Sequence, residues 1–390
     1  MSCVKNRVSL ATLTGLFLLV ASSFLVFPFI DGVSAQTYFV ARTVKVGSDP
    51  RAVLFDPANG EVYVSLWLSD AVAVLSGSTN TFVENLTVGY GPLGLAFDSS
   101  NGYVYVADAR SNNVSIIDGS TNTVVENLTV GAGPVAVAFD SSNGMIYVAN
   151  ANPPPPHGPF SGLFRGTVSV INGATDTEVS AVKVGLDPSG IAFDPSNGEI
   201  YVSNAASNTV SVINGSSNTV VANITTGSGP SGVAYDSVTG QPYVSNGNSN
   251  TVSVINSQTN TVAENITVGT YPFGVAYDPA SREVFISNEG SNTVSVISDT
   301  TDTAIATVNV GTYPLGEAFD SSNGKVFVAD SGSDTVSVLA TSFPTASLSN
   351  WEILTTGVVV IVLVLVGIML WSLLRRRQSR QGDPAPDGQQ

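Results

Sequence analysis

Short runs of alternating apolar and polar residues follow one another between residues 37 and 340, and clusters of Gly, Asn, Asp and Pro separate them. One cycle, residues 184–225, holds apolar runs at 190–193 and 199–202, an alternating run at 209–213 and a further run at 219–224. Alternation with period two, in runs rich in Val, Ile, Thr and Tyr, is typical of half-buried β-strands. The pattern predicts four short strands per cycle and no helix in this region.

The cycle occurs seven times, and each copy begins with a Val-Gly or Thr-Gly pair at residue 46, 88, 130, 184, 226, 268 or 310. Five of the six intervals are 42 residues, as in 88 − 46, and the interval 130–184 is longer by 54 − 42 = 12 residues. Repeats of about 40–45 residues with four strands each are typical of β-propeller blades. The last copy has three strands, and an extra strand at 38–44 precedes the first copy. We therefore predict an all-β, seven-bladed β-propeller closed by its N-terminal strand, which leaves no free sheet edge.

Two repeated motifs add a family resemblance. Tyr-Val-Ser-Asn occurs at 201–204 and 243–246, and Ser-Asn-Thr-Val-Ser-Val-Ile occurs at 207–213, 249–255 and 291–297. These motifs resemble the YVTN-type β-propeller repeats of archaeal surface-layer proteins and of bacterial secreted, YncE-like proteins. The resemblance covers residues 37–340 and implies a secreted or cell-surface binding platform. It implies no catalytic residues, because the family shares none.

An apolar segment lies near each end of the chain. Residues 1–35 have the basic start, apolar run and Val-Ser-Ala ending of a secretory signal peptide, and an uncleaved N-terminal anchor is the alternative. Residues 353–374 carry no charge, are long enough to cross a bilayer, and precede three arginines at 375–377. We predict a signal peptide (1–35), a propeller (36–340), a linker (341–351), a C-terminal transmembrane helix (352–374) and a cytoplasmic tail (375–390). The propeller is then extracellular.

The charge and the cysteine content exclude several functions. The net charge is −16, which argues against nucleic acid, because phosphates attract the opposite sign. The single cysteine, Cys3, lies in the predicted signal peptide, so the propeller has no thiol for catalysis or for binding zinc. We expect no cofactor and no bound metal.

Seven aspartates recur at one position of the repeat and could suggest a ring of metal ligands. Each begins the turn between the first two strands of its blade, where Asx side chains accept hydrogen bonds from backbone amides. A residue that every blade carries serves what every blade needs, so we interpret the set as structural: Asp56, Asp98, Asp140, Asp194, Asp236, Asp278 and Asp320.

Function is better sought where the repeats differ. Glu317 occupies the innermost strand at a position that is apolar in the other six blades. We expect a solvated carboxylate facing the central channel; a catalytic or metal-binding acid is the alternative, although no histidine accompanies it. The insertion at 153–165 begins with four prolines and contains His157, Phe160 and Phe164. Polyproline is stiff, so this loop can project a recognition surface, or it is a tolerated surface insertion.

Aromatic and basic residues gather in the loops of neighbouring blades. Blades six, seven, one, two and three are consecutive around a closed ring, and the loops in question lie on one face of a propeller. Aromatic residues with a few polar neighbours favour protein or carbohydrate binding, whereas burial beneath the loops would give them a structural role. The candidate binding residues are Trp67, Tyr90, Arg110, His157, Phe160, Phe164, Tyr271, Phe273 and Tyr313.

Six Asn-x-Ser/Thr sequons occur in the repeats. Four share one register in the outermost strand and would place glycans on the rim of the propeller, although ordinary strand sequence also explains them. The six asparagines are Asn85, Asn113, Asn127, Asn214, Asn223 and Asn265.

Taken together, the sequence favours a membrane-anchored cell-surface glycoprotein without catalytic activity, which binds an extracellular protein or glycan or packs laterally in a surface layer. The alternative is a channel-metal-dependent hydrolase or lactonase-like enzyme centred on Glu317.

Overall fold

The computed structural model describes residues 36–151, 165–342 and 361–374. The predicted signal peptide, residues 152–164 of the insertion, the segment 343–360 and the predicted tail 375–390 lie outside the described residues. The chain divides into two units, and Tyr38–Ser342 is the compact one.

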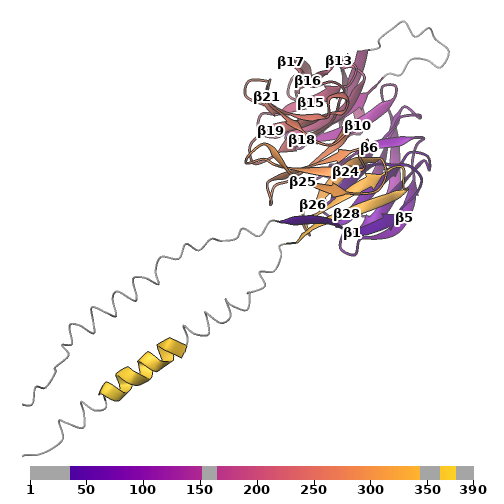
Figure 1. Ribbon diagram of the computed structural model, residues 1–390. Coiled ribbons are helices and arrows are strands. Elements are labelled where there is room, and N and C mark those ends of the chain that lie inside the picture. Colours follow the sequence, from indigo (N-terminus) through magenta and orange to yellow (C-terminus); the bar gives the residue numbers. More distant parts are fainter. Residues whose placement is uncertain (1–35, 152–164, 343–360, 375–390) are drawn as a thin grey trace, which may run out of the picture. The chain divides into compact units, whose positions relative to one another are not determined.

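The compact unit consists of seven four-stranded antiparallel sheets, one for each blade (Figure 1). Blades one to three comprise β2 (Pro50–Asp56), β3 (Glu61–Leu66), β4 (Ala71–Ser76) and β5 (Thr81–Thr87); β6 (Pro92–Asp98), β7 (Tyr103–Asp108), β8 (Asn113–Asp118) and β9 (Thr123–Thr129); and β10 (Pro134–Asp140), β11 (Met145–Asn150), β12 (Arg165–Asn172) and β13 (Thr177–Leu186). Blades four to six comprise β14 (Pro188–Asp194), β15 (Glu199–Asn204), β16 (Thr209–Asn214) and β17 (Thr219–Thr225); β18 (Pro230–Asp236), β19 (Gln241–Asn246), β20 (Thr251–Asn256) and β21 (Thr261–Thr267), with the 3-10 turn η1 (Gly247–Ser249); and β22 (Pro272–Asp278), β23 (Glu283–Asn288), β24 (Thr293–Ser298) and β25 (Thr303–Asn309).

Blade seven is built from both ends of the propeller. Its strands are β26 (Pro314–Asp320), β27 (Lys325–Asp330), β28 (Thr335–Ser342) and, on the outside, β1 (Thr37–Lys45), in the order β26-β27-β28-β1. Figure 1 shows the indigo β1 beside the yellow β28. The predicted seven blades and the predicted closure by the N-terminal strand are therefore confirmed.

The strand order gives the ring two opposite sides. The turns between first and second strands and between third and fourth strands lie on one side, which we call the turn side. The connections between second and third strands and the links between blades lie on the other, which we call the loop side. Apolar side chains of the second and third strands fill the space between neighbouring sheets, and most of them are fully buried. Their burial supplies the main stabilisation of the ring.

Buried tyrosines of the second strands link each blade to the next. The hydroxyl of Tyr63 donates to Asn122 Oδ1 at 2.7 Å, and that of Tyr243 donates to Asp302 Oδ1 at 2.8 Å. Each acceptor is a turn residue with positive φ between the third and fourth strands of the following blade. Tyr105, Tyr147 and Tyr201 make the equivalent bonds. A buried hydroxyl is thus satisfied across every one of these interfaces.

Blades six and seven are exceptions to this rule. In blade six the tyrosine is replaced by Phe285, and the following blade has no turn between its third and fourth strands, because β28 and β1 come from opposite ends of the propeller. Blade seven also has phenylalanine at this position, Phe327, although blade one does have a turn there, so the missing turn does not by itself account for the change. Tyr38 of β1 packs edge-on against Phe285 with centroids 6.3 Å apart, and its hydroxyl donates to Glu283 Oε1.

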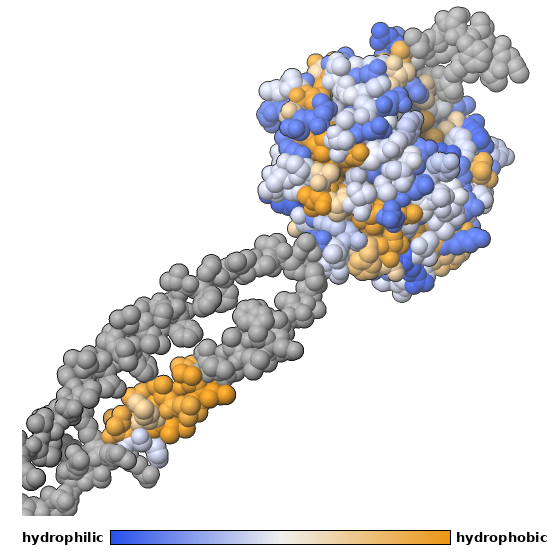
Figure 2. Space-filling view, in the orientation of Figure 1, coloured by the Kyte–Doolittle hydropathy of each residue, from blue (hydrophilic) through white to orange (hydrophobic). Residues whose placement is uncertain are grey.

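The second unit contains an α-helix at 361–374 with exposed apolar side chains, coloured orange in Figure 2. Among the described residues, the structure contains no helix that is both long enough and apolar enough to cross a bilayer. The predicted transmembrane segment, 352–374, lies in part outside those residues.

Candidate functional site

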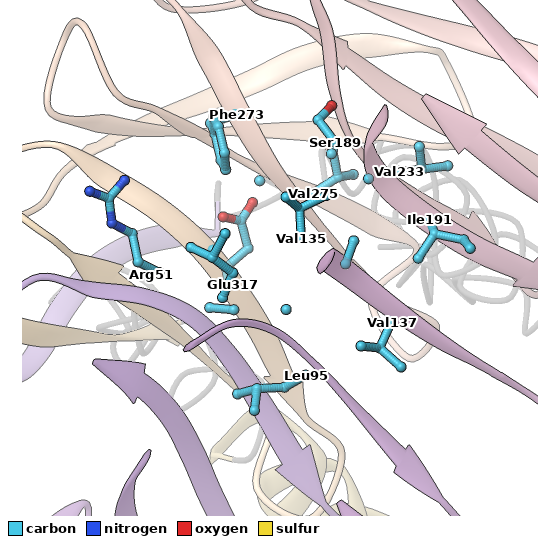
Figure 3. Close-up of a pocket in the computed structure, with 18 of the residues that line it drawn as sticks. Arg51, Leu95, Val135, Val137, Ser189, Ile191, Val233, Phe273, Val275 and Glu317 are labelled. Atoms are coloured by element: carbon cyan, nitrogen blue, oxygen red, sulfur yellow. The ribbon is translucent and has the colours of Figure 1, made fainter. Parts of the chain in front are cut away.

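A cavity of about 360 Å³ lies on the axis of the ring, where the innermost strands of all seven blades meet (Figure 3). Glycine and alanine at the adjoining positions let these strands approach one another closely. A Cβ added at Gly94, for example, would stand 2.6 Å from Ala136 Cα of the next blade. At one equivalent position, each blade contributes a side chain to the lining, namely Val53, Leu95, Val137, Ile191, Val233, Val275 and Glu317.

Glu317 is buried rather than solvated, which corrects the prediction. Its exposed fraction is 8%, because the carboxyl group turns toward blade six, where Oε1 accepts a 3.0 Å hydrogen bond from the backbone N–H of Ser287. Burial raises the pKa of Glu317 from its usual value to about 8. The second oxygen, Oε2, has no hydrogen-bond partner among the described residues. At neutral pH the group is mainly a neutral carboxylic acid.

Charged and aromatic residues stand around the same cavity. Arg51, Asp187 and Phe273 line it together with Glu317, and Arg51 forms an ion pair with Asp49 at 2.7 Å. Within the described ranges, no group of three or more His, Cys, Asp or Glu residues is arranged to hold a metal ion.

Trp67 forms the centre of a cation–π stack on the loop side. The guanidinium carbon of Arg110 lies 4.3 Å from the ring centroid, and that of Arg51 lies 5.7 Å from it. Gly91 makes room for the stack, since a Cβ at this residue would stand 2.9 Å from Trp67 Cζ3. Two cations over one indole hold the half-buried ring in place and leave Arg110 exposed to solvent.

Tyr271 and Tyr313 occupy an unusual backbone conformation. Their φ angles are 53° and 51°, at the position just before the repeat's proline, where blades two, three and five have glycine with φ between 60° and 66°. The N–H of Tyr271 donates to Asn250 Oδ1 and that of Tyr313 donates to Asn292 Oδ1, both at 2.9 Å. A bulky residue at positive φ is strained relative to glycine. Even so, 43% of Tyr271 and 56% of Tyr313 are exposed.

The other predicted binding residues lie in different settings. Tyr90 is 67% exposed on the loop side, while Phe273 is half-buried at the cavity. His157, Phe160 and Phe164 lie outside the described residues. Leu68, next to Trp67 and 61% exposed, was not predicted as a site residue, because one exposed leucine is unremarkable in a sequence.

The seven repeated aspartates have the structural role that turn chemistry predicts. Asp98 Oδ1 accepts from the backbone N–H of Ser100 at 2.8 Å and from its hydroxyl at 2.6 Å. The other six make the corresponding backbone bond, with distances between 2.7 and 2.9 Å: Asp56, Asp140, Asp194, Asp236, Asp278 and Asp320.

A buried polar pair beneath the loop side was not predicted. At the end of the second strand, blades three to six have asparagine, whose side-chain amide donates to a serine of the third strand, as Asn246 does to Ser253 at 2.9 Å. In blade two the residue is Asp108, which accepts from the Ser115 hydroxyl at 2.6 Å. Burial raises the pKa of Asp108 to about 7 and that of its blade-seven counterpart, Asp330, to about 6.

Four sequon asparagines lie exposed on outermost strands: Asn85 on β5, Asn127 on β9, Asn223 on β17 and Asn265 on β21. Asn113 is half-buried on β8. Asn214 is half-buried too, and its Oδ1 accepts from the backbone N–H of Ser216 at 3.1 Å. The four rim positions are therefore the accessible ones.

The chain resembles known proteins in fold. No protein-family model matches the sequence, and no curated protein matches it. Among solved structures, the chain is similar to Kuenenia stuttgartiensis hydrazine synthase, with a TM-score of 0.66 and 18% identity over 81% of this chain and 99% of that chain. At this identity the likeness shows the fold alone. The chain is a seven-bladed β-propeller protein.

Proposed function

We propose that this protein binds an extracellular protein or glycan through the loop side of its propeller and performs no covalent chemistry. The observation that carries the proposal is the pair Tyr271 and Tyr313. Both rings are exposed, and both residues hold a strained backbone conformation that glycine adopts in three other blades without strain. All seven blades have positive φ at this position, so the conformation belongs to the repeat. What sets blades six and seven apart is a large, exposed aromatic side chain where the other blades have glycine or aspartate, and this difference supports a binding role.

The neighbouring loops support the same proposal. The guanidinium carbon of Arg110 on blade two lies 4.3 Å from the ring centroid of Trp67 on blade one. Tyr90, in the link between these two blades, is exposed. Tryptophan, tyrosine and arginine are the residues that contribute most to binding energy at protein interfaces. Blades six, seven, one and two are consecutive in the ring, so these residues lie on the loop side of four neighbouring blades. We call this set of residues the aromatic arc: Tyr271, Tyr313, Trp67, Arg110 and Tyr90.

Localisation at the cell surface is part of this proposal. An apolar N-terminal segment with the features of a secretory signal and an uncharged segment at 353–374 followed by arginines support an exported, C-terminally anchored protein. The exposed sequons on the rim leave both sides of the ring free of glycans if they are modified. The resemblance to YVTN-type surface-layer proteins supports the same location.

The test is a binding array of glycans and fractionated cell-envelope proteins, probed with the full-length chain with and without EDTA. We expect a ligand that Trp67→Ala loses and that Phe82→Val retains. Phe82 is also an exposed aromatic residue, with an exposed fraction of 44%, but it lies on the outermost strand β5. Blade two has Val124 at the equivalent position, so Phe82→Val is a matched control. A blank array, or a ligand that Trp67→Ala retains, contradicts the proposal. A signal that EDTA alone abolishes would favour a metal-dependent function.

A further inference from the structure

Blade five departs from the repeat where its second and third strands reach the turn side. In blades one to four and in blade six, the first residue of the second strand pairs with the last residue of the third strand. In blade five the ladder between β19 and β20 stops two residues earlier, at the pair Tyr243–Val254. The preceding residue of β19 is Pro242, which has no backbone N–H to donate. The ends of the two strands, Gln241 and Asn256, are therefore not paired with each other.

The contact between the two turns of blade five changes at the same place. In blades one to four and in blade six, a backbone N–H of the turn after the third strand donates to a carbonyl of the turn after the first strand, as Gly215 does to Gly198 at 2.9 Å. Among the described residues, blade five lacks this backbone bond, and the hydroxyl of Ser257 donates to the carbonyl of Gly240 at 2.7 Å instead. A side-chain bridge thus replaces the direct backbone contact.

A pocket of about 350 Å³ lies at this opening, on the turn side of blades four and five. Its volume is in the range of small-molecule sites. Hydroxyl and amide side chains line it together with Tyr235 and Val238, and the lining contains no charged side chain. Gln241 and Gln258 are the only glutamines between residues 37 and 340, and both line this pocket. Within the described ranges their side-chain amides make no hydrogen bond, so both amides are free to bind a ligand.

We infer that this pocket binds a neutral saccharide unit, and that the amides of Gln241 and Gln258 form hydrogen bonds with its hydroxyl groups. A side-chain amide both donates and accepts, as a sugar hydroxyl does, so the two kinds of group match. The half-buried ring of Tyr235 and the 52% exposed side chain of Val238 supply apolar surface for the C–H groups of a pyranose ring. An anionic saccharide is disfavoured, because the chain has a net charge of −16 and Asp236 is buried in the same turn.

This site is separate from the aromatic arc, which lies on the loop side, and it does not depend on the proposed function. The residues that open the pocket and provide its free amides are Pro242, Gln241 and Gln258, and no other blade has proline or glutamine at these positions. The turn aspartates that all blades share keep their structural role.

The test is a saturation-transfer NMR titration of the full-length chain with methyl β-D-glucoside, methyl α-D-mannoside, methyl β-D-galactoside and the charged control methyl β-D-glucuronide. We expect a neutral glycoside to bind and the glucuronide to bind more weakly than it, by about fivefold or more. Gln258→Ser, which copies blades one, two and four, should weaken binding of the neutral glycoside about tenfold, as one or two lost hydrogen bonds would. Thr300→Ser, at the same repeat position in blade six, is the matched control and should leave the affinity unchanged.

A second variant tests the origin of the pocket. Pro242→Val gives blade five the valine of blades one, two, six and seven, with a backbone N–H that can extend the ladder. Its melting temperature should stay the same or rise, and its affinity for the glycoside should fall by about tenfold or more. Trp67→Ala should bind the glycoside as wild type does, which distinguishes this site from the loop side. Absence of binding by all three neutral glycosides, a change of less than threefold in Gln258→Ser or Pro242→Val, or loss of binding in Trp67→Ala would overturn the inference.

Discussion

The turn side and the loop side of the ring contain the same kinds of residue in different roles. On the turn side, each blade places an aspartate at the same position with the same backbone hydrogen bond, as Asp98 does with Ser100. On the loop side, the position before the repeat's proline holds aspartate, glycine or tyrosine, depending on the blade. What all blades share maintains the fold, and what single blades carry is available for function. This division can be tested by mutations on either side.

The largest effect on stability is expected from replacing Asp108, an aspartate beneath the loop side at a position where blades three to six have asparagine. Asp108 has a folded pKa of about 7 against 3.8 when unfolded, so its stabilisation is complete below pH 4 and is lost as the pH rises through 7. Asp108→Asn, which copies blades three to six, should be more stable than wild type by roughly 3 kcal/mol at pH 8. The advantage should vanish near pH 4. Urea denaturation at both pH values measures it, and an equal difference at both would contradict the assigned pKa.

On the turn side, Asp98→Ala should destabilise the propeller by about 1 kcal/mol, because the backbone N–H and the hydroxyl of Ser100 lose their acceptor. Chemical denaturation gives the free energy of unfolding. Asp98→Asn keeps an acceptor oxygen at the same place and serves as the control. Binding at the aromatic arc should not change in either variant; a loss of binding without a loss of stability would show that the two sides are not separate.

Two matched glycine substitutions separate the cost of backbone strain from a disturbance of the Trp67 stack. Gly91→Ala on the loop side and Gly102→Ala on the turn side both place a Cβ at positive φ, 64° and 81°, and each should cost about 1 kcal/mol. Only the first brings the Cβ to Trp67, whereas nothing lies within 4 Å of the second. Thermal denaturation should therefore give the larger shift for Gly91→Ala, in which Trp67 and Arg110 must also move. Tryptophan emission should change in Gly91→Ala alone, and a change in both variants would contradict the structure of the stack.

The sequence predicted the architecture more completely than the site. Periodicity and turn residues determined the seven blades, because both signals are local and occur in every repeat. The unpaired strand at 38–44 determined the closure, because it supplies the strand that the last repeat lacks. The environment of Glu317 was wrongly predicted, since its burial depends on a contact with Ser287 that lies 30 residues earlier and in another blade. The stack on Trp67 also joins residues of two blades, and no periodic pattern identifies it.

Some features could have been found from the sequence and were missed. The Asn–Ser pairs recur in register, as Asn204 and Ser211 do, so the substitution of aspartate at 108 and 330 was visible as a departure. Likewise, Phe285 departs from a tyrosine that five blades share. Phe327 of blade seven departs from it in the same way, although the blade that follows blade seven does have the turn.

The most direct test of the division between the two sides is the double variant Tyr271→Gly and Tyr313→Gly. Glycine suits φ angles of 53° and 51° better than tyrosine, so the melting temperature should stay the same or rise. Affinity for the ligand selected on the array should fall at least tenfold. A lower melting temperature with unchanged affinity would show that the two rings serve the fold, and would contradict a binding role for the loop side.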